Sequence, residues 1–174
     1  LIMATIFVVA MLVLPFWEWV SKRLNKRWAY ISGVSFLAVI LLILSSLTPA
    51  TGLPFLIGLS VLAGIGVSAM HVMPWAILPD AIEYGEWKTG ERQEGMFYSL
   101  ITLAQKVASS IAVPVALLVL QATGYVPNSD TQPASAIFGI RIVAGVIPAF
   151  TLGMGILFTF LYPLGRDQYQ QIER

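Results

Sequence analysis

Residues 95–122 read GMFYSLITLAQKVASSIAVPVALLVLQA, and this stretch decides the class of fold. Its only charged residue is Lys106. A helix needs about 20 predominantly apolar residues to cross a hydrocarbon core about 30 Å thick, whereas a strand of a membrane barrel needs only about 9–11. The stretch therefore predicts a membrane-spanning α-helix.

Apolar runs of similar length recur along the whole chain. The composition agrees with them, since 57% of the 174 residues are hydrophobic and 11% are charged, against roughly 25% charged in a soluble domain. We predict an all-α integral membrane protein, a single membrane domain with five transmembrane helices at about residues 1–20, 28–47, 54–78, 95–122 and 138–163 and a tail at 164–174. Because the chain opens inside an apolar run without an initiator Met, we expect a fragment of a longer protein.

The composition also argues against several kinds of chemistry. With no cysteine and one histidine, disulfides, thiolate catalysis and the usual zinc sites are excluded. The sequence contains no glycine-rich phosphate loop, no Gly-x-Ser-x-Gly turn and no His-Glu-x-x-His pair. A net charge of +1 gives no support for nucleic-acid binding. We expect no enzyme, no cofactor and no metal site in this chain.

The basic residues predict how the chain is oriented in the membrane. They fall in alternate connections and in the tail, so that eight of the ten lie on one side: Lys22, Arg23, Lys26, Arg27, Lys88, Arg92, Arg166 and Arg174. Only Arg141 lies near the opposite side. Because cytoplasmic loops carry the excess of Lys and Arg, we predict a cytoplasmic C-terminus in a multi-pass protein of the cell (inner or plasma) membrane.

Lys106 is the most informative single residue. It lies eleven positions into the fourth predicted span, which at 1.5 Å per residue is about 16 Å deep and close to the midplane. A basic group there costs roughly 2.5–3.5 kcal/mol even on the insertion scale. No acidic residue of the chain lies at that depth. We therefore expect Lys106 to face a cavity, an acid in a missing part of the protein, or the solute.

Hydroxyl groups share the helix face of Lys106. Thr102, Lys106 and either Ser109 or Ser110 follow each other at helical spacing. Such a stripe can bind a polar solute, with Thr102 beside Lys106. Alternatively, the hydroxyls bond only the carbonyls of the preceding turn.

His71 and Trp75 are one helical turn apart in the third predicted span. An aromatic ring beside a hydrogen-bonding group is a reasonable platform for a sugar ring, so both residues are candidate substrate contacts. His71 can also couple transport to protons. The alternative is that His71 only packs between helices.

The connection after the third span is rich in charge. It reads PDAIEYGEWKTGERQEG and contains five acids and two bases. The candidate gating residues in it are Asp80, Glu83, Glu86, Lys88, Arg92 and Glu94. They can pair with basic loops elsewhere, and exchange of such pairs can gate a conformational change. The alternative is ordinary solvated surface charge.

Residues 73–106, MPWAILPDAIEYGEWKTGERQEGMFYSLITLAQK, closely resemble the signature of the glycoside-pentoside-hexuronide:cation symporters, the melibiose permease-like family of the major facilitator superfamily. The resemblance implies twelve helices in two halves, of which this chain would supply helices eight to twelve. It implies that Lys106 lies near the sugar and cation pocket, that Thr102 lies beside it, and that the charged segment is cytoplasmic. His71 stands where the family has a pocket tryptophan, which leaves the substrate open.

The resulting hypothesis is alternating-access symport of a glycoside, pentoside or hexuronide with Na⁺ or H⁺. The implied partners are a small-molecule solute, the missing N-terminal helices of the same protein and the lipid bilayer. One alternative is a lysolipid or other amphiphile as the cargo, because related animal lysophosphatidylcholine symporters share much of the pattern. Another is a non-transporting membrane module that organises partners.

Overall fold

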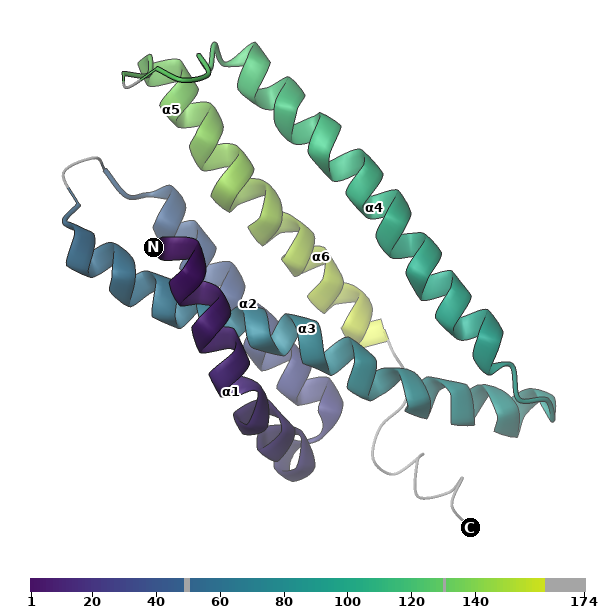
Figure 1. Ribbon diagram of the computed structural model, residues 1–174. Helices are drawn as coiled ribbons and strands as arrows, with labels where there is room; N and C mark the ends of the chain where they lie inside the picture. Colours follow the sequence, from purple (N-terminus) through teal and green to yellow (C-terminus); the bar gives the residue numbers. More distant parts are fainter. Residues whose placement is uncertain (49–50, 130, 162–174) are drawn as a thin grey trace.

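The computed structural model describes residues 1–48, 51–129 and 131–161. Within this part the chain forms five helices that are long and apolar enough to cross a membrane (Figure 1). They are α1 (Ile2–Leu24), α2 (Lys26–Ser45), α3 (Leu53–Thr89), α4 (Glu94–Ala122) and a fifth helix composed of α5 (Ala134–Arg141), a π-helical turn (Ile142–Val146) and α6 (Ile147–Leu161). The expected all-α class is confirmed. The predicted tail at 164–174 and the last two residues of the fifth predicted span lie outside the described residues.

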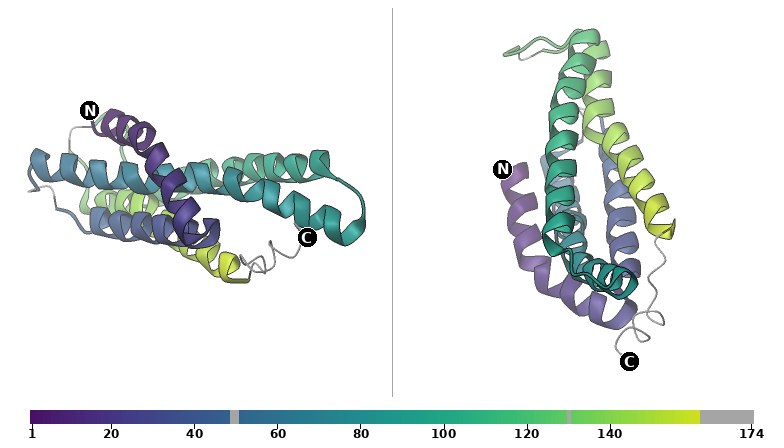
Figure 2. Two further views of the ribbon diagram at one scale, coloured as in Figure 1. Left: turned by 90° about the horizontal axis from the view of Figure 1, so that it is seen from below. Right: turned by 90° about the vertical axis from the view of Figure 1, so that its right-hand side faces the viewer.

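The core lies where α1 and α2 pack along α3 (Figure 2). One buried cluster joins all three helices: Trp17, Val20, Ala29, Ala69 and Met73. The indole Nε1 of Trp17 also donates a hydrogen bond to the carbonyl of Ile65 at 2.9 Å, which satisfies the polar atom of a buried tryptophan. The three helices therefore form a compact unit against which the remaining helices are positioned.

Small residues allow this close packing. A Cβ atom at Gly64 would meet the backbone oxygen of Ile6 at 2.8 Å, so α1 approaches α3 directly there. Ser60 is 2% exposed and Ser68 1% exposed on the same stripe. Gly66 lies on another face of α3, where a Cβ atom would meet the Cβ of Leu37 at 2.7 Å and its Cα at 3.0 Å. Close backbone approach of this kind is the usual role of small residues between membrane helices.

Gly66→Ala should destabilise the protein, because the added methyl group meets the backbone of α2. We expect a loss of about 1–3 kcal/mol, as is typical of overpacking. The measurement is the melting temperature of the purified protein in detergent. Gly58→Ala is the matched control, since a Cβ atom at Gly58 meets nothing within 4 Å. Equal melting temperatures for the two variants would contradict this account of the α2–α3 contact.

α3 continues further than the sequence suggests. The charged segment was expected as a connection from the end of the third span, but it is helical to Thr89, and Gly90 ends the helix with a left-handed φ of 77°. Ile82 is 3% exposed, so the extension packs against the rest of the chain. With 37 residues, α3 is about 56 Å long, well beyond the thickness of a hydrocarbon core of about 30 Å. The helix bends in its second half (Figure 1), where Pro74 and Pro79 interrupt its hydrogen bonds.

α4 makes few contacts with the unit formed by α1, α2 and α3. It contacts α3 at one end and α5 with the π-helical turn at the other, and none of its residues is buried in the described structure. A groove of about 560 Å³ separates its second half from the fifth helix, with Ile111, Val115 and Pro148 among its lining residues. The polar face of α4 is therefore open for contacts outside this chain.

Candidate functional site

Lys106 lies in a wide, shallow depression on the exposed surface of α4, together with the other polar residues of its helix face. This depression, called the Lys106 cavity below, has a volume of about 380 Å³ and is lined by Tyr98, Ser99, Thr102, Leu103 and Lys106. Within the described residues the ammonium group of Lys106 has no ion-pair partner. The expected polar stripe is therefore present as a surface that offers a positive charge without its counter-ion.

The hydroxyl groups of this stripe donate hydrogen bonds to backbone carbonyls of the preceding helical turn, which is the second of the two alternatives given above for these residues. Thr102 donates to the carbonyl of Tyr98 at 2.8 Å, and Ser110 donates to the carbonyl of Lys106 at 2.8 Å. Ser109 donates likewise to Gln105 at 2.9 Å. Because a hydroxyl oxygen keeps its acceptor lone pairs when its hydrogen is used in this way, Thr102 can still accept a hydrogen bond from a solute in the cavity.

Tyr98 connects the stripe to α3, and the sequence analysis missed it. Its ring stacks on that of Trp75, with centroids 6.3 Å apart and an angle of 21° between the planes. Tyr98 precedes Thr102 by four residues and Lys106 by eight, so helical spacing was the signal that could have found it. The stacked pair brings Trp75 against Tyr98, which lines the same cavity as Lys106.

His71 lies at a different cavity. It lines a space of about 150 Å³ with residues of α1, among them Phe7, Met11 and Leu14. Its Nδ1 is 3.0 Å from the carbonyl oxygen of Val67. The structure therefore does not bring His71 and Lys106 together. His71 lines its cavity with residues of α1, whereas Trp75, one turn further along α3, contacts Tyr98 of α4.

The charged segment pairs with the first residue of α2. Lys26 Nζ lies 2.6 Å from Asp80 Oδ1, and the Asp80 side chain is only 19% exposed. Arg92 pairs within the segment, with Glu86 at 3.2 Å and Glu94 at 3.4 Å. Since Glu86 is on α3 and Glu94 begins α4, Arg92 spans the turn between these helices.

The Arg92 pairs are electrostatically favourable but exposed. The hydrogen bond to Glu94 and the nearby charges of Glu86 and Glu94 raise the pKa of the Arg92 guanidinium further above its ordinary value. Because all three side chains are well exposed, such pairs contribute little to stability. Lys88 is in the last turn of α3 and is exposed. The half-buried Lys26–Asp80 pair is therefore the better candidate for a structural lock.

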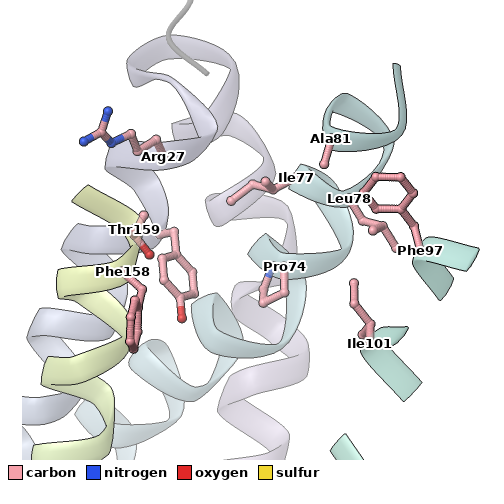
Figure 3. Close-up of a pocket in the computed structure, with 10 residues that line it drawn as sticks. Arg27, Pro74, Ile77, Leu78, Ala81, Phe97, Ile101, Phe158 and Thr159 are labelled. Carbon is pink, nitrogen blue, oxygen red and sulfur yellow. The ribbon is translucent and has the colours of Figure 1, made fainter. Parts of the chain in front are cut away.

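A further cleft of about 380 Å³ lies where α2, α3, α4 and α6 approach one another (Figure 3). Its lining is mostly apolar, with Tyr30, Pro74, Ile101 and Phe158 among it. Arg27 lies at one end and donates a hydrogen bond from Nη2 to the carbonyl of Phe160 at 2.8 Å. Among the described residues, no three His, Asp or Glu side chains are grouped so that they could hold a metal ion.

The comparisons with known proteins agree with one another. Residues 1–166 match the family described as MFS/sugar transport protein. The chain is 34% identical over 121 residues to an uncharacterized symporter of Synechocystis, covering 67% of this chain and 22% of that protein. It is 30% identical over 175 residues to sodium-dependent lysophosphatidylcholine symporter 1-B of Danio rerio, covering 97% of this chain and 32% of that protein. It is 39% identical over 115 residues to an uncharacterized symporter of Bacillus subtilis, covering 66% of this chain and 25% of that protein.

The chain thus spans between about a fifth and a third of the length of these relatives. The family consists of transport proteins, which confirms the expectation that the chain is no enzyme, and its five long helices are part of a larger major facilitator fold. The chain belongs to the MFS/sugar transport protein family.

Proposed function

We propose that the chain is the C-terminal part of a cation-coupled symporter that moves a glycoside, pentoside or hexuronide with Na⁺ or H⁺. The observation that carries the proposal is the cavity that Lys106, Thr102 and Tyr98 line, with the ring of Trp75 stacked on that of Tyr98. A cation, a hydroxyl and an aromatic face together suit a polyhydroxylated ring. Alternating access then moves one helix bundle against the other around this midplane site.

The rest of the carrier completes the site in this proposal. The unburied face of α4 contacts the N-terminal helices, and one of their acids or the solute supplies the missing partner of Lys106. The C-terminus is cytoplasmic in a plasma or inner membrane, as the positive residues suggest. The whole chain forms one membrane domain, with the charged segment at the cytoplasmic end helping to lock or release that face.

A second candidate cargo is a lysolipid. The zebrafish relative is named as a lysophosphatidylcholine symporter, and the apolar cleft with Arg27 at one end is consistent with an acyl chain and an anionic headgroup. The Arg27 Nε is buried and has no hydrogen-bond partner in the described structure. This candidate differs from the first in its solute, while the coupling cation and the alternating-access mechanism are the same.

A competition experiment distinguishes the two cargoes. The full-length carrier is reconstituted in liposomes, and cation-driven uptake is measured with methyl β-D-xylopyranoside, methyl α-D-galactopyranoside and methyl β-D-glucuronide, each labelled. We expect at least one sugar to accumulate and unlabelled sugar to compete, while 1-palmitoyl lysophosphatidylcholine does not. Uptake of labelled 1-palmitoyl lysophosphatidylcholine, with no uptake of any sugar, would favour the second cargo. Uptake of neither class would contradict both.

A further inference from the structure

Four basic residues lie where α1 ends and α2 begins: Lys22, Arg23, Lys26 and Arg27. Lys22 pairs with Glu18 of α1 at 2.7 Å, and Lys26 pairs with an acid of α3 at 2.6 Å. Arg27 donates a hydrogen bond to a backbone carbonyl of α6. Among the described residues, Arg23 is the one member of the four whose side chain has no oxygen partner. Its positive charge is therefore not neutralised in this part of the chain.

An aromatic ring lies beside the Arg23 side chain instead. The Cζ atom of Arg23 is 4.6 Å from the centroid of the Trp19 ring. A guanidinium that stacks on a ring presents its flat face to it, whereas its N–H donors lie in the plane of the group. Arg23 is exposed and Trp19 is 52% exposed. The N–H edge of the guanidinium is therefore available to an oxyanion.

The face of α1 that leads to Arg23 changes from apolar to amphipathic along the helix. Leu12, Phe16, Trp19 and Arg23 follow one another at spacings of three or four residues, so they share one face. Leu12 is 75% exposed and Phe16 is 49% exposed. At 1.5 Å per residue, Leu12 and Arg23 are about 16 Å apart, which is half of a hydrocarbon core about 30 Å thick. The order matches one leaflet, with acyl chains at Leu12, the interface at Trp19 and phosphates at Arg23.

We propose that Arg23 and Trp19 bind the headgroup of an anionic phospholipid whose acyl chain lies along Phe16 and Leu12. The phosphate accepts hydrogen bonds from the guanidinium, whose fork of N–H groups matches two phosphate oxygens. An anionic lipid complements the charge that no described acid neutralises. The inference rests on the proposed orientation of the chain, because the cytoplasmic leaflet carries the anionic lipids. It goes beyond the proposed transport function, since this lipid belongs to the surrounding leaflet and is not the cargo.

The test measures lipid binding to the purified full-length carrier by native mass spectrometry, which resolves successive bound lipids. The probes are 1-palmitoyl-2-oleoyl phosphatidylglycerol and the phosphatidylcholine with the same acyl chains. We expect the wild type to bind the phosphatidylglycerol more tightly. Arg23→Gln should weaken one phosphatidylglycerol site about fivefold, the contribution of one arginine near an anionic surface, and leave phosphatidylcholine binding unchanged. Trp19→Leu should weaken the same site less, because the charge remains but the ring beside it is lost.

Lys22→Gln is the matched control. It changes the net charge by the same amount next to Arg23, but Lys22 already pairs with Glu18, so each phosphatidylglycerol Kd should change less than about twofold. Equal weakening in the two variants would show diffuse attraction and would overturn the site.

Two further measurements separate this inference from its competitors. Unchanged lipid binding in Arg23→Gln, together with a lower melting temperature in lipid-free detergent, would assign Arg23 to an acid of the N-terminal helices and overturn the lipid site. Uptake in liposomes of phosphatidylcholine alone tests transport separately, and there Arg23→Gln should transport as the wild type does. Absence of uptake by the wild type would contradict the transport proposal and leave the lipid site standing.

Discussion

Replacing Lys106 by Ala in the full-length carrier should reduce cation-driven accumulation by about 100-fold or more, because it removes the intramembrane cation that the proposed site offers to the solute or to an acid of the N-terminal helices. The ammonium lies in the polar cavity of α4 and has no counter-ion in the described part of the chain. The measurement is initial uptake in liposomes, with insertion checked by the amount of protein recovered in the membrane.

Lys22→Ala is the control for the loss of a lysine. Lys22 is 71% exposed and pairs with Glu18 within one helical turn, and such pairs contribute little, so uptake should change less than about twofold. Lys106→Arg tests whether the positive charge alone is sufficient, since it keeps the cation but alters its hydrogen-bond geometry. Normal accumulation in Lys106→Ala would remove Lys106 from the site.

Reversing the charge of Asp80 should give the second large effect. Asp80→Lys places two ammonium groups where Lys26 now lies 2.6 Å from a carboxylate. We expect uptake to fall about tenfold, because like charges at contact push the start of α2 away from α3. The double variant Asp80→Lys with Lys26→Asp restores the attraction and should recover most of the uptake.

An exposed pair provides the comparison for this charge swap. The Arg92 and Glu86 side chains are 56% and 42% exposed, so reversing them singly or together should change uptake little. If the double variant Asp80→Lys with Lys26→Asp takes up solute no faster than Asp80→Lys alone, the attraction between the two side chains does not contribute to transport. The proposed lock at the charged end of the bundle would then be wrong.

The sequence predicted those features of the fold that depend on local pattern. Apolar runs of spanning length predict the helices, and the spacing of Thr102 and Lys106 predicts one shared face. The helical extension of α3 was missed because charged residues were interpreted as a connection, although Ile82 continues the buried pattern and only Gly90 ends the helix. The π-helical turn before Pro148 gives no clear local signal.

The candidate site depended more on tertiary contacts. The stacking of Trp75 on Tyr98 requires the turn between α3 and α4 to return the chain at one particular angle, which no spacing rule provides. Similarly, His71 lines a cavity with residues of α1, whereas Trp75, one turn further along α3, contacts Tyr98 of α4.

The measurement that tests the central claim most directly is gradient-driven accumulation by the wild-type carrier in liposomes. Labelled methyl β-D-xylopyranoside, methyl α-D-galactopyranoside or methyl β-D-glucuronide is supplied outside, with an inward gradient of Na⁺ or of H⁺. The account predicts that at least one sugar reaches a higher concentration inside than outside, and that an ionophore for the coupling cation abolishes this excess. Sugar uptake that only equilibrates under either gradient, or that is absent, would contradict cation-coupled sugar symport.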